Sequence, residues 1–114
     1  MTVVTWIVGG LLALAFTGAG VAKLARADQM VETLNHLGVS ENLQRLIGAV
    51  ELAAAAGIVL AIWVPVLGLL AAIGLVLLMI GAVIYHQRAN DPPQGWAPPA
   101  VLGILAAVFV VLVL

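Results

Sequence analysis

The sequence contains no cysteine, which excludes disulfide exchange, thiolate nucleophiles, iron–sulfur clusters and cysteine-ligated zinc. Charged residues are also scarce, at 8% of the chain, whereas soluble domains have about 25%. The net charge of −1 offers no electrostatic basis for nucleic-acid binding. The two histidines, His36 and His86, lie too far apart in the sequence to indicate a metal site. Hydrophobic residues make up 65% of the chain, which predicts an integral membrane protein.

Four apolar runs are each long enough to cross a bilayer. A membrane-spanning helix needs about 20 residues, because a rise of ~1.5 Å per residue must cover a ~30 Å hydrocarbon core. The predicted spans are residues 3–22, 43–64, 65–86 and 96–114. Pro98 and Pro99 are expected in the first turn of the last helix, where a backbone amide needs no intrahelical acceptor. No polar linker separates the spans, so we predict one all-α domain, residues 1–114, built as a four-transmembrane-helix bundle.

The Lys and Arg residues cluster in two predicted loops. Lys23, Arg26 and Arg45 lie in or beside the first loop, and Arg88 lies in the third. Because positive residues favour the cytoplasmic side, both termini are predicted to lie outside. The positive charges follow the first span instead of preceding it, so we expect this span to be retained and not cleaved as a signal peptide. The Ala-, Val-, Leu- and Gly-rich composition is typical of a bacterial plasma membrane protein.

Residues 28–38, between the first two spans, have the pattern of a short amphipathic helix. Its apolar face consists of Met30, Val31, Leu34 and Leu37. We expect Asp28 to cap its start and Gly38 to end it in a left-handed conformation, with Ser40 capping the next span. About eleven residues cannot span a bilayer, so we predict an interfacial helix on the cytoplasmic side. It either covers the end of the bundle as a connector or senses a lipid or a partner.

Small residues recur on one face of each span. In a bilayer, close approach through small residues holds helices together, because apolar side chains gain little by leaving lipid. The predicted packing faces are Gly9, Ala13, Phe16, Gly20 and Lys23; Gln44, Gly48, Glu51, Ala55 and Ile58; Gly68, Ala72, Leu75, Met79, Ala82 and His86; and, in the fourth span, Gly103 and Ala107.

Glu51 is a carboxylate deep within a predicted span, where an unpaired charge costs about 2.5–3.5 kcal/mol. Side chains lean toward the N-terminus of their own helix. Glu51 on the second span and Lys23 and His86 on its antiparallel neighbours are therefore directed to one level. We predict a Lys23–Glu51 pair with His86 and Tyr85 hydrogen-bonded nearby. These four are the candidate ligand-binding residues, and we assign no catalytic residue and no metal ligand.

This cluster admits two interpretations. It is either a buried polar clasp that fixes the helix register, or a cytoplasm-facing pocket for a proton, a quinone or a lipid head group. Arg88 and Asp91, in the loop 87–94, are interpreted instead as ordinary solvated charges at the interface.

Short motifs in the first three spans are similar to those of a known family. GAGVAKL ends the first span at residues 18–24, IGAVELA opens the second at residues 47–53, and GAVIYH closes the third at residues 81–86. Their order and spacing resemble the DoxX-like family of small four-helix membrane proteins. The resemblance extends over about residues 16–88 and leaves the fourth span without a motif. It implies that Lys23, Glu51 and His86 occupy the family's polar positions.

The resemblance implies a role beside other proteins. Such relatives include a membrane subunit associated with thiosulfate:quinone oxidoreduction, a mycobacterial member linked to a membrane oxidoreductase complex and, more distantly, NACHO-type membrane chaperones. We expect an accessory protein that binds a quinone or lipid head group and supports a redox or assembly partner. A redox role has to use a bound quinone or a partner's cofactor, because the chain has no haem or flavin motif and we predict no cofactor of its own.

Two alternatives stay open. A small proton-coupled transporter also has four spans and a membrane-embedded glutamate, although proton exchange is better served by a carboxylate without a fixed lysine partner. A purely structural assembly factor needs no small ligand, and its small-residue faces suit a homo-oligomer. A standalone enzyme is not expected, because the sequence shows no nucleophile–base pair, phosphate loop or metal-ligand spacing. The expected partners are the lipid bilayer, the head group, a membrane or redox protein or a second copy, and not nucleic acid.

Overall fold

The computed structural model describes residues 2–114, and this part of the chain forms five helices. They are α1 (Val3–Leu24), α2 (Asp28–His36), α3 (Glu41–Leu60), α4 (Pro65–Arg88) and α5 (Pro93–Val113). Four of them are long and apolar enough to cross a membrane, and α2 is the short helix between α1 and α3. The predicted all-α fold with four spans and one short connecting helix is therefore confirmed. Met1, part of the expected domain 1–114, lies outside the described residues.

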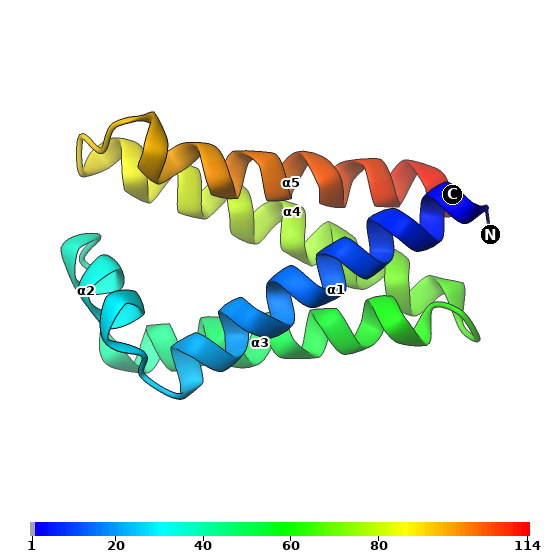
Figure 1. Cartoon of the computed structure of the whole chain (residues 1–114), viewed down its shortest axis with the longest axis horizontal. Coiled ribbons are helices and arrows are strands. Elements are labelled where there is room, and N and C mark those ends of the chain that lie inside the picture. Colours follow the sequence, from blue (N-terminus) through cyan, green and yellow to red (C-terminus); the bar gives the residue numbers. More distant parts are fainter. Residues whose placement is uncertain (1) are drawn as a thin grey trace.

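The long helices pack as two pairs, α1 with α3 and α4 with α5 (Figure 1). Further contacts between α3 and α4 and between α1 and α5 join the pairs. Both ends of the chain lie at one end of the bundle, beside the turn between α3 and α4 (Figure 1). The short helix α2 and the turn between α4 and α5 lie at the opposite end, which we call the α2 end (Figure 1). The two basic loops therefore share one end of the molecule.

Local sequence signals account for several helix ends. The Ser40 side chain accepts a hydrogen bond from the Leu43 amide at 3.3 Å, so the predicted cap is confirmed. Gly38 has a φ of +79°, which confirms the left-handed residue expected after the short helix. Pro65 opens α4, where its missing amide hydrogen costs no hydrogen bond.

Two predictions of helix starts were wrong. Asp28 is the first residue of α2 and not its cap; Ala27 precedes the helix without a side-chain hydrogen bond. The Asp28 carboxylate still lies in the first turn, where its negative charge interacts favourably with the positive end of the helix dipole. Pro98 and Pro99 lie inside α5, because this helix begins earlier, at Pro93. Pro92 and Pro93 fix φ and so start a helical turn that hydrophobicity alone does not reveal.

The core confirms the predicted faces of the first three spans. Gly9, Phe16 and Gly20 on α1 are buried, as are the predicted residues of α3 and, on α4, Gly68, Ala72, Leu75 and Met79. The predicted face of the fourth span was right at Gly103, where an added Cβ would lie 3.1 Å from Cβ of Met79. It was wrong at Ala107, which is exposed while Ala106 and Phe109 are buried. The Phe109 ring fills the space above Gly9 and Gly68, where an added Cβ would lie 2.9 and 3.3 Å from it. On α5 a large side chain therefore packs into the glycines of its neighbours.

Candidate functional site

A close contact between α1 and α3 places the first two candidate residues. A Cβ on Gly20 would lie 2.8 Å from the backbone oxygen of Gly48, so only glycine allows the two helices to approach this closely. One turn further along each helix are Lys23 and Glu51. The Lys23 Nζ lies 2.7 Å from Oε1 of Glu51, and the predicted ion pair is present.

The pair is buried in the interior of the bundle. The Glu51 side chain is 2% exposed and the Lys23 side chain is 11% exposed. Two charges removed from water in this way depend on each other, since loss of one leaves the other uncompensated. The Lys23 ammonium carries three donors, so it can contact Glu51 and a further acceptor at the same time.

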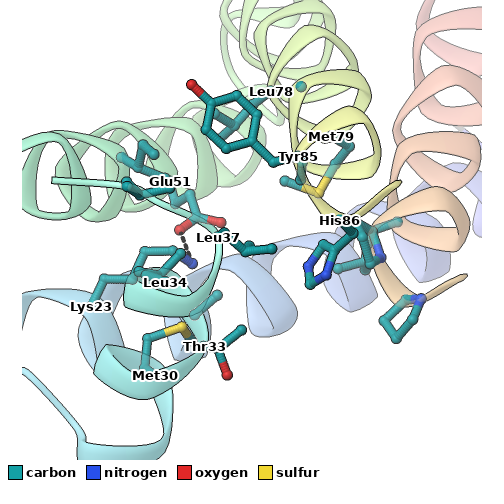
Figure 2. A pocket seen from close by; sticks show the side chains of 18 of the residues that line it. Lys23, Met30, Thr33, Leu34, Leu37, Glu51, Leu78, Met79, Tyr85 and His86 are labelled. Carbon is teal, nitrogen blue, oxygen red and sulfur yellow. Dashed lines mark ion pairs between the residues drawn. The ribbon is translucent and has the colours of Figure 1, made fainter. Parts of the chain in front are cut away.

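A cavity of about 390 Å³ adjoins this pair at the α2 end (Figure 2). Lys23 and Glu51 lie on its wall, and so do Tyr85 and His86 near the end of α4. The structure therefore brings all four candidate residues to one cavity. The remaining wall is mostly apolar and comes from every helix, including Phe16 from α1, Met30, Thr33 and Leu34 from α2, Ile47 from α3, Met79 from α4, and Pro98, Pro99 and Leu102 from α5.

The expected hydrogen bonds of His86 and Tyr85 to the Lys23–Glu51 pair are absent from residues 2–114, so that part of the prediction was wrong. Nδ1 of His86 instead contacts Oδ2 of Asp91 at 2.6 Å. The chain reverses at Asn90, whose φ is +58°, and the Asp91 amide donates to the His86 carbonyl at 3.0 Å. This turn brings the Asp91 side chain back over the last turn of α4.

Asp91 is the residue that the sequence analysis missed. Its other oxygen, Oδ1, accepts a hydrogen bond from Nε2 of His36 at 2.7 Å, and its side chain is 14% exposed. Hydrogen bonds from His36 and His86 hold the pKa of the Asp91 carboxyl below its ordinary value. The interpretation of Asp91 as a solvated charge was therefore wrong. The only sequence signal was its position five residues after His86, in a turn that contains Asn90, Pro92 and Pro93.

A second polar contact, made by the Gln44 side chain, connects α3 to α2 and to the segments on both sides of it. The Gln44 side chain is fully buried, and its amide donates to Oδ1 of Asn35 at 2.9 Å and to the Val39 carbonyl at 2.8 Å. Its Oε1 accepts a hydrogen bond from the Arg26 guanidinium. Gln44 of α3 is therefore hydrogen-bonded to the turn before α2, to α2 itself and to the segment directly after it.

The chain matches the DoxX-like family over residues 7–109. It is a member of the DoxX-like family. The match confirms the resemblance seen in the first three spans and extends it into the fourth, where the sequence showed no motif. No curated protein and no solved structure matches the chain.

In this DoxX-like protein the Gly-x-x-Lys and Gly-x-x-Glu elements have a physical basis. Gly20 and Gly48 allow the helix contact, and the residues three positions later, Lys23 and Glu51, form the ion pair beside it. The arrangement offers an apolar space with a fixed cation and a carboxylate on its wall.

Proposed function

We propose that this DoxX-like membrane protein is an accessory protein that binds the head group of a quinone or a lipid in the cavity and supports a redox or assembly partner. One observation carries the proposal. A cavity of about 390 Å³ with mostly apolar walls has a 2% exposed carboxylate and its lysine partner on its wall. Ligand sites have this composition, an apolar pocket with a few convergent polar groups.

The chemistry of the wall suits an acceptor-rich head group. The Lys23 ammonium can donate to a quinone carbonyl or a lipid phosphate while Glu51 keeps it in place. Tyr85 and His86 line the same cavity and offer further hydrogen-bonding groups. The apolar side chains of the wall suit the ring or the first part of a lipid tail.

The direction of access follows from the distribution of positive charge. Lys23 and Arg26 lie at and just after the end of α1, Arg45 lies near the start of α3, and Arg88 ends α4. These helix ends lie at the α2 end of the molecule (Figure 1). Under the positive-inside rule this end faces the cytoplasm and both termini lie outside, as in a bacterial plasma membrane protein. A partner that supplies or receives the ligand would then act from the cytoplasmic side.

The test is mass spectrometry of small molecules extracted from gently purified protein. Wild type is compared with Glu51→Gln and with the control Glu32→Gln, which changes an exposed carboxylate of α2 in the same way. A quinone or a specific lipid retained in stoichiometric amount by wild type and control, and lost from Glu51→Gln, supports the proposal. Equal amounts of bulk lipid in all three overturn it.

A second variant covers the case in which Glu51→Gln does not fold. Ala82 lines the cavity from α4, so Ala82→Phe fills the space while the ion pair remains. This variant should lose the ligand with the bundle intact. Retention of the ligand by folded Ala82→Phe would place the binding site elsewhere.

One observation favours a purely structural role as the second candidate. The ion pair lies directly beside the close backbone contact of Gly20 and Gly48, where a clasp would fix the register of α1 and α3. In that case Glu51→Gln destabilises the bundle, and wild type carries no specific molecule. Proton-coupled efflux in reconstituted vesicles would instead indicate the transporter alternative.

A further inference from the structure

The short helix α2 forms one side of the proposed binding cavity. Met30, Thr33 and Leu34 of α2 line the cavity, and Leu37 does so directly after it (Figure 2). The helix is short and flanked by residues in left-handed conformations, Arg26 with φ +58° and Gly38 with φ +79°. This side of the cavity is therefore formed by a short helix with a tight turn before it and another after it.

One hydrogen bond joins this wall to the opposite side of the cavity. His36, the last residue of α2, donates from Nε2 to Oδ1 of Asp91 at 2.7 Å. Asp91 lies in the turn between α4 and α5. In residues 2–114 the structure shows no other hydrogen bond or ion pair that joins α2 to α4, to α5 or to the turn between them. The His36–Asp91 contact is thus the polar latch between α2 and the α4–α5 pair.

The second oxygen of the same carboxylate holds a residue of the cavity wall. Oδ2 of Asp91 contacts Nδ1 of His86 at 2.6 Å, and the His86 ring reaches from α4 toward Leu37 (Figure 2). Because a carboxylate can only accept, this contact places a proton on Nδ1. Nε2 is then the ring nitrogen left for a ligand.

The first turn of α5 leaves room for this contact. Gly95 lies directly against it, and a Cβ there would be 3.1 Å from Nδ1 of His86 and 3.2 Å from Oδ2 of Asp91. Any residue larger than glycine at position 95 would therefore crowd the His86–Asp91 contact.

We propose that Asp91 is a positioning residue of the cavity, which orients the His86 imidazole on the cavity wall and at the same time latches α2 over the cavity. The binding role of His86 rests on the proposed function. The latch and the orientation of the ring are properties of the protein alone, so they can be measured without a ligand.

The latch is tested by cysteine labelling, which the absence of native cysteine makes specific. Leu34 is buried and lines the cavity, so Leu34→Cys reports on opening of α2 when a water-soluble maleimide is added to the protein in nanodiscs. His36→Ala and Asp91→Ala should each raise the labelling rate about fivefold, the effect of losing one hydrogen bond. The control Glu32→Cys, exposed on the same helix, should react at one rate in every background.

The orientation of His86 is tested by nitrogen NMR of the imidazole ring at a pH where the ring is neutral. In wild type Nδ1 carries the proton, because Oδ2 of Asp91 accepts a hydrogen bond from it. In Asp91→Ala this acceptor is gone, so nothing fixes the proton on Nδ1 and the fraction of rings protonated on Nε2 should rise, which moves the chemical shifts of both ring nitrogens. The shifts should keep the wild-type pattern in His36→Ala, a distinction that a merely structural role of Asp91 does not produce.

Each outcome decides. Equal labelling rates in wild type, His36→Ala and Asp91→Ala overturn the latch. A His86 ring protonated on Nε2 in wild type, or a tautomer unchanged in Asp91→Ala, overturns the positioning role. His36→Ala alters a side chain that is 56% exposed, so it keeps the test usable if Asp91→Ala does not fold. If the labelling and NMR experiments give the expected results but no specific molecule is extracted, only the proposed function is overturned. If a specific molecule is extracted but the labelling and NMR experiments fail, only the role of Asp91 is overturned.

Discussion

The protein holds two carboxylates in very different ways. Glu51 lies within the span formed by α3, is 2% exposed, and relies on one lysine delivered by a close helix contact. Asp91 lies in a turn at the α2 end, is 14% exposed, and accepts hydrogen bonds from two histidines. In the apolar interior a charge needs a fixed opposite charge, whereas at the end of the bundle hydrogen bonds suffice. The first contact therefore joins two helices inside the bundle, and the second joins α2 to the turn between α4 and α5 at its end.

The largest effect is expected from Lys23→Met. It leaves Glu51 buried without its cation, which costs about 3–5 kcal/mol when a buried pair is broken. The free energy of unfolding in detergent or bicelles measures the loss. The double variant Lys23→Met with Glu51→Gln removes both charges and should recover much of it. If the double variant is no more stable than Lys23→Met, the two residues do not act as a pair.

The second-largest loss of stability is expected from Gly20→Ala. The added Cβ would lie 2.8 Å from a backbone oxygen of α3, which cannot move without the rest of the helix. Forcing the helices apart costs about 1–3 kcal/mol, as overpacking does in well-packed cores. The control is Gly18→Ala on the same helix, where an added Cβ meets nothing within 4 Å. The thermal midpoint should fall for Gly20→Ala and should not fall for Gly18→Ala, where alanine gains only helix propensity. Equal shifts would contradict the close contact.

The contribution of Asp91 to stability should vanish in acid. Its pKa is lowered in the folded protein from an ordinary value of 3.8, so the charged form is the one that folding favours. The contribution is present above pH 3.8 and is lost as the pH falls through the lower folded pKa. The difference in unfolding free energy between wild type and Asp91→Asn, measured from pH 5 down to pH 3, should stay level and then shrink. A difference that grows on acidification has the wrong sign for this assignment.

The smallest effect is expected from Gly95→Ala. The added Cβ would lie 3.0 Å from Cβ of Asp91 and 3.1 Å from Nδ1 of His86, so these side chains must give by a few tenths of an ångström. A loss of less than about 1 kcal/mol is expected, because alanine also favours the helix. Gly74→Ala, in open space on α4, gives the helix gain alone. Gly95→Ala should therefore be less stable than Gly74→Ala in the same thermal assay.

Much of the fold could be predicted because membrane spans are set by length and hydropathy, and the packing faces of the first three spans by helical spacing. The Lys23–Glu51 pair was predictable for the same reason, since glycine, lysine and glutamate positions share those faces. The face of α5 was predicted only in part, because Phe109 packs into glycines of other helices and no periodicity shows such a fit. The His36–Asp91 contact joins residues 55 positions apart through a turn, and such contacts leave no local pattern.

The placement of the chain ends has a consequence for how copies can be joined. Because Thr2 and Leu114 lie at the same end of the bundle, two copies linked in tandem keep the same orientation in a bilayer (Figure 1). Such a fusion gives parallel repeats, and not the inverted-topology repeats on which many secondary transporters are built. A reporter domain attached to either terminus would also lie in the same compartment, away from α2 and its cavity.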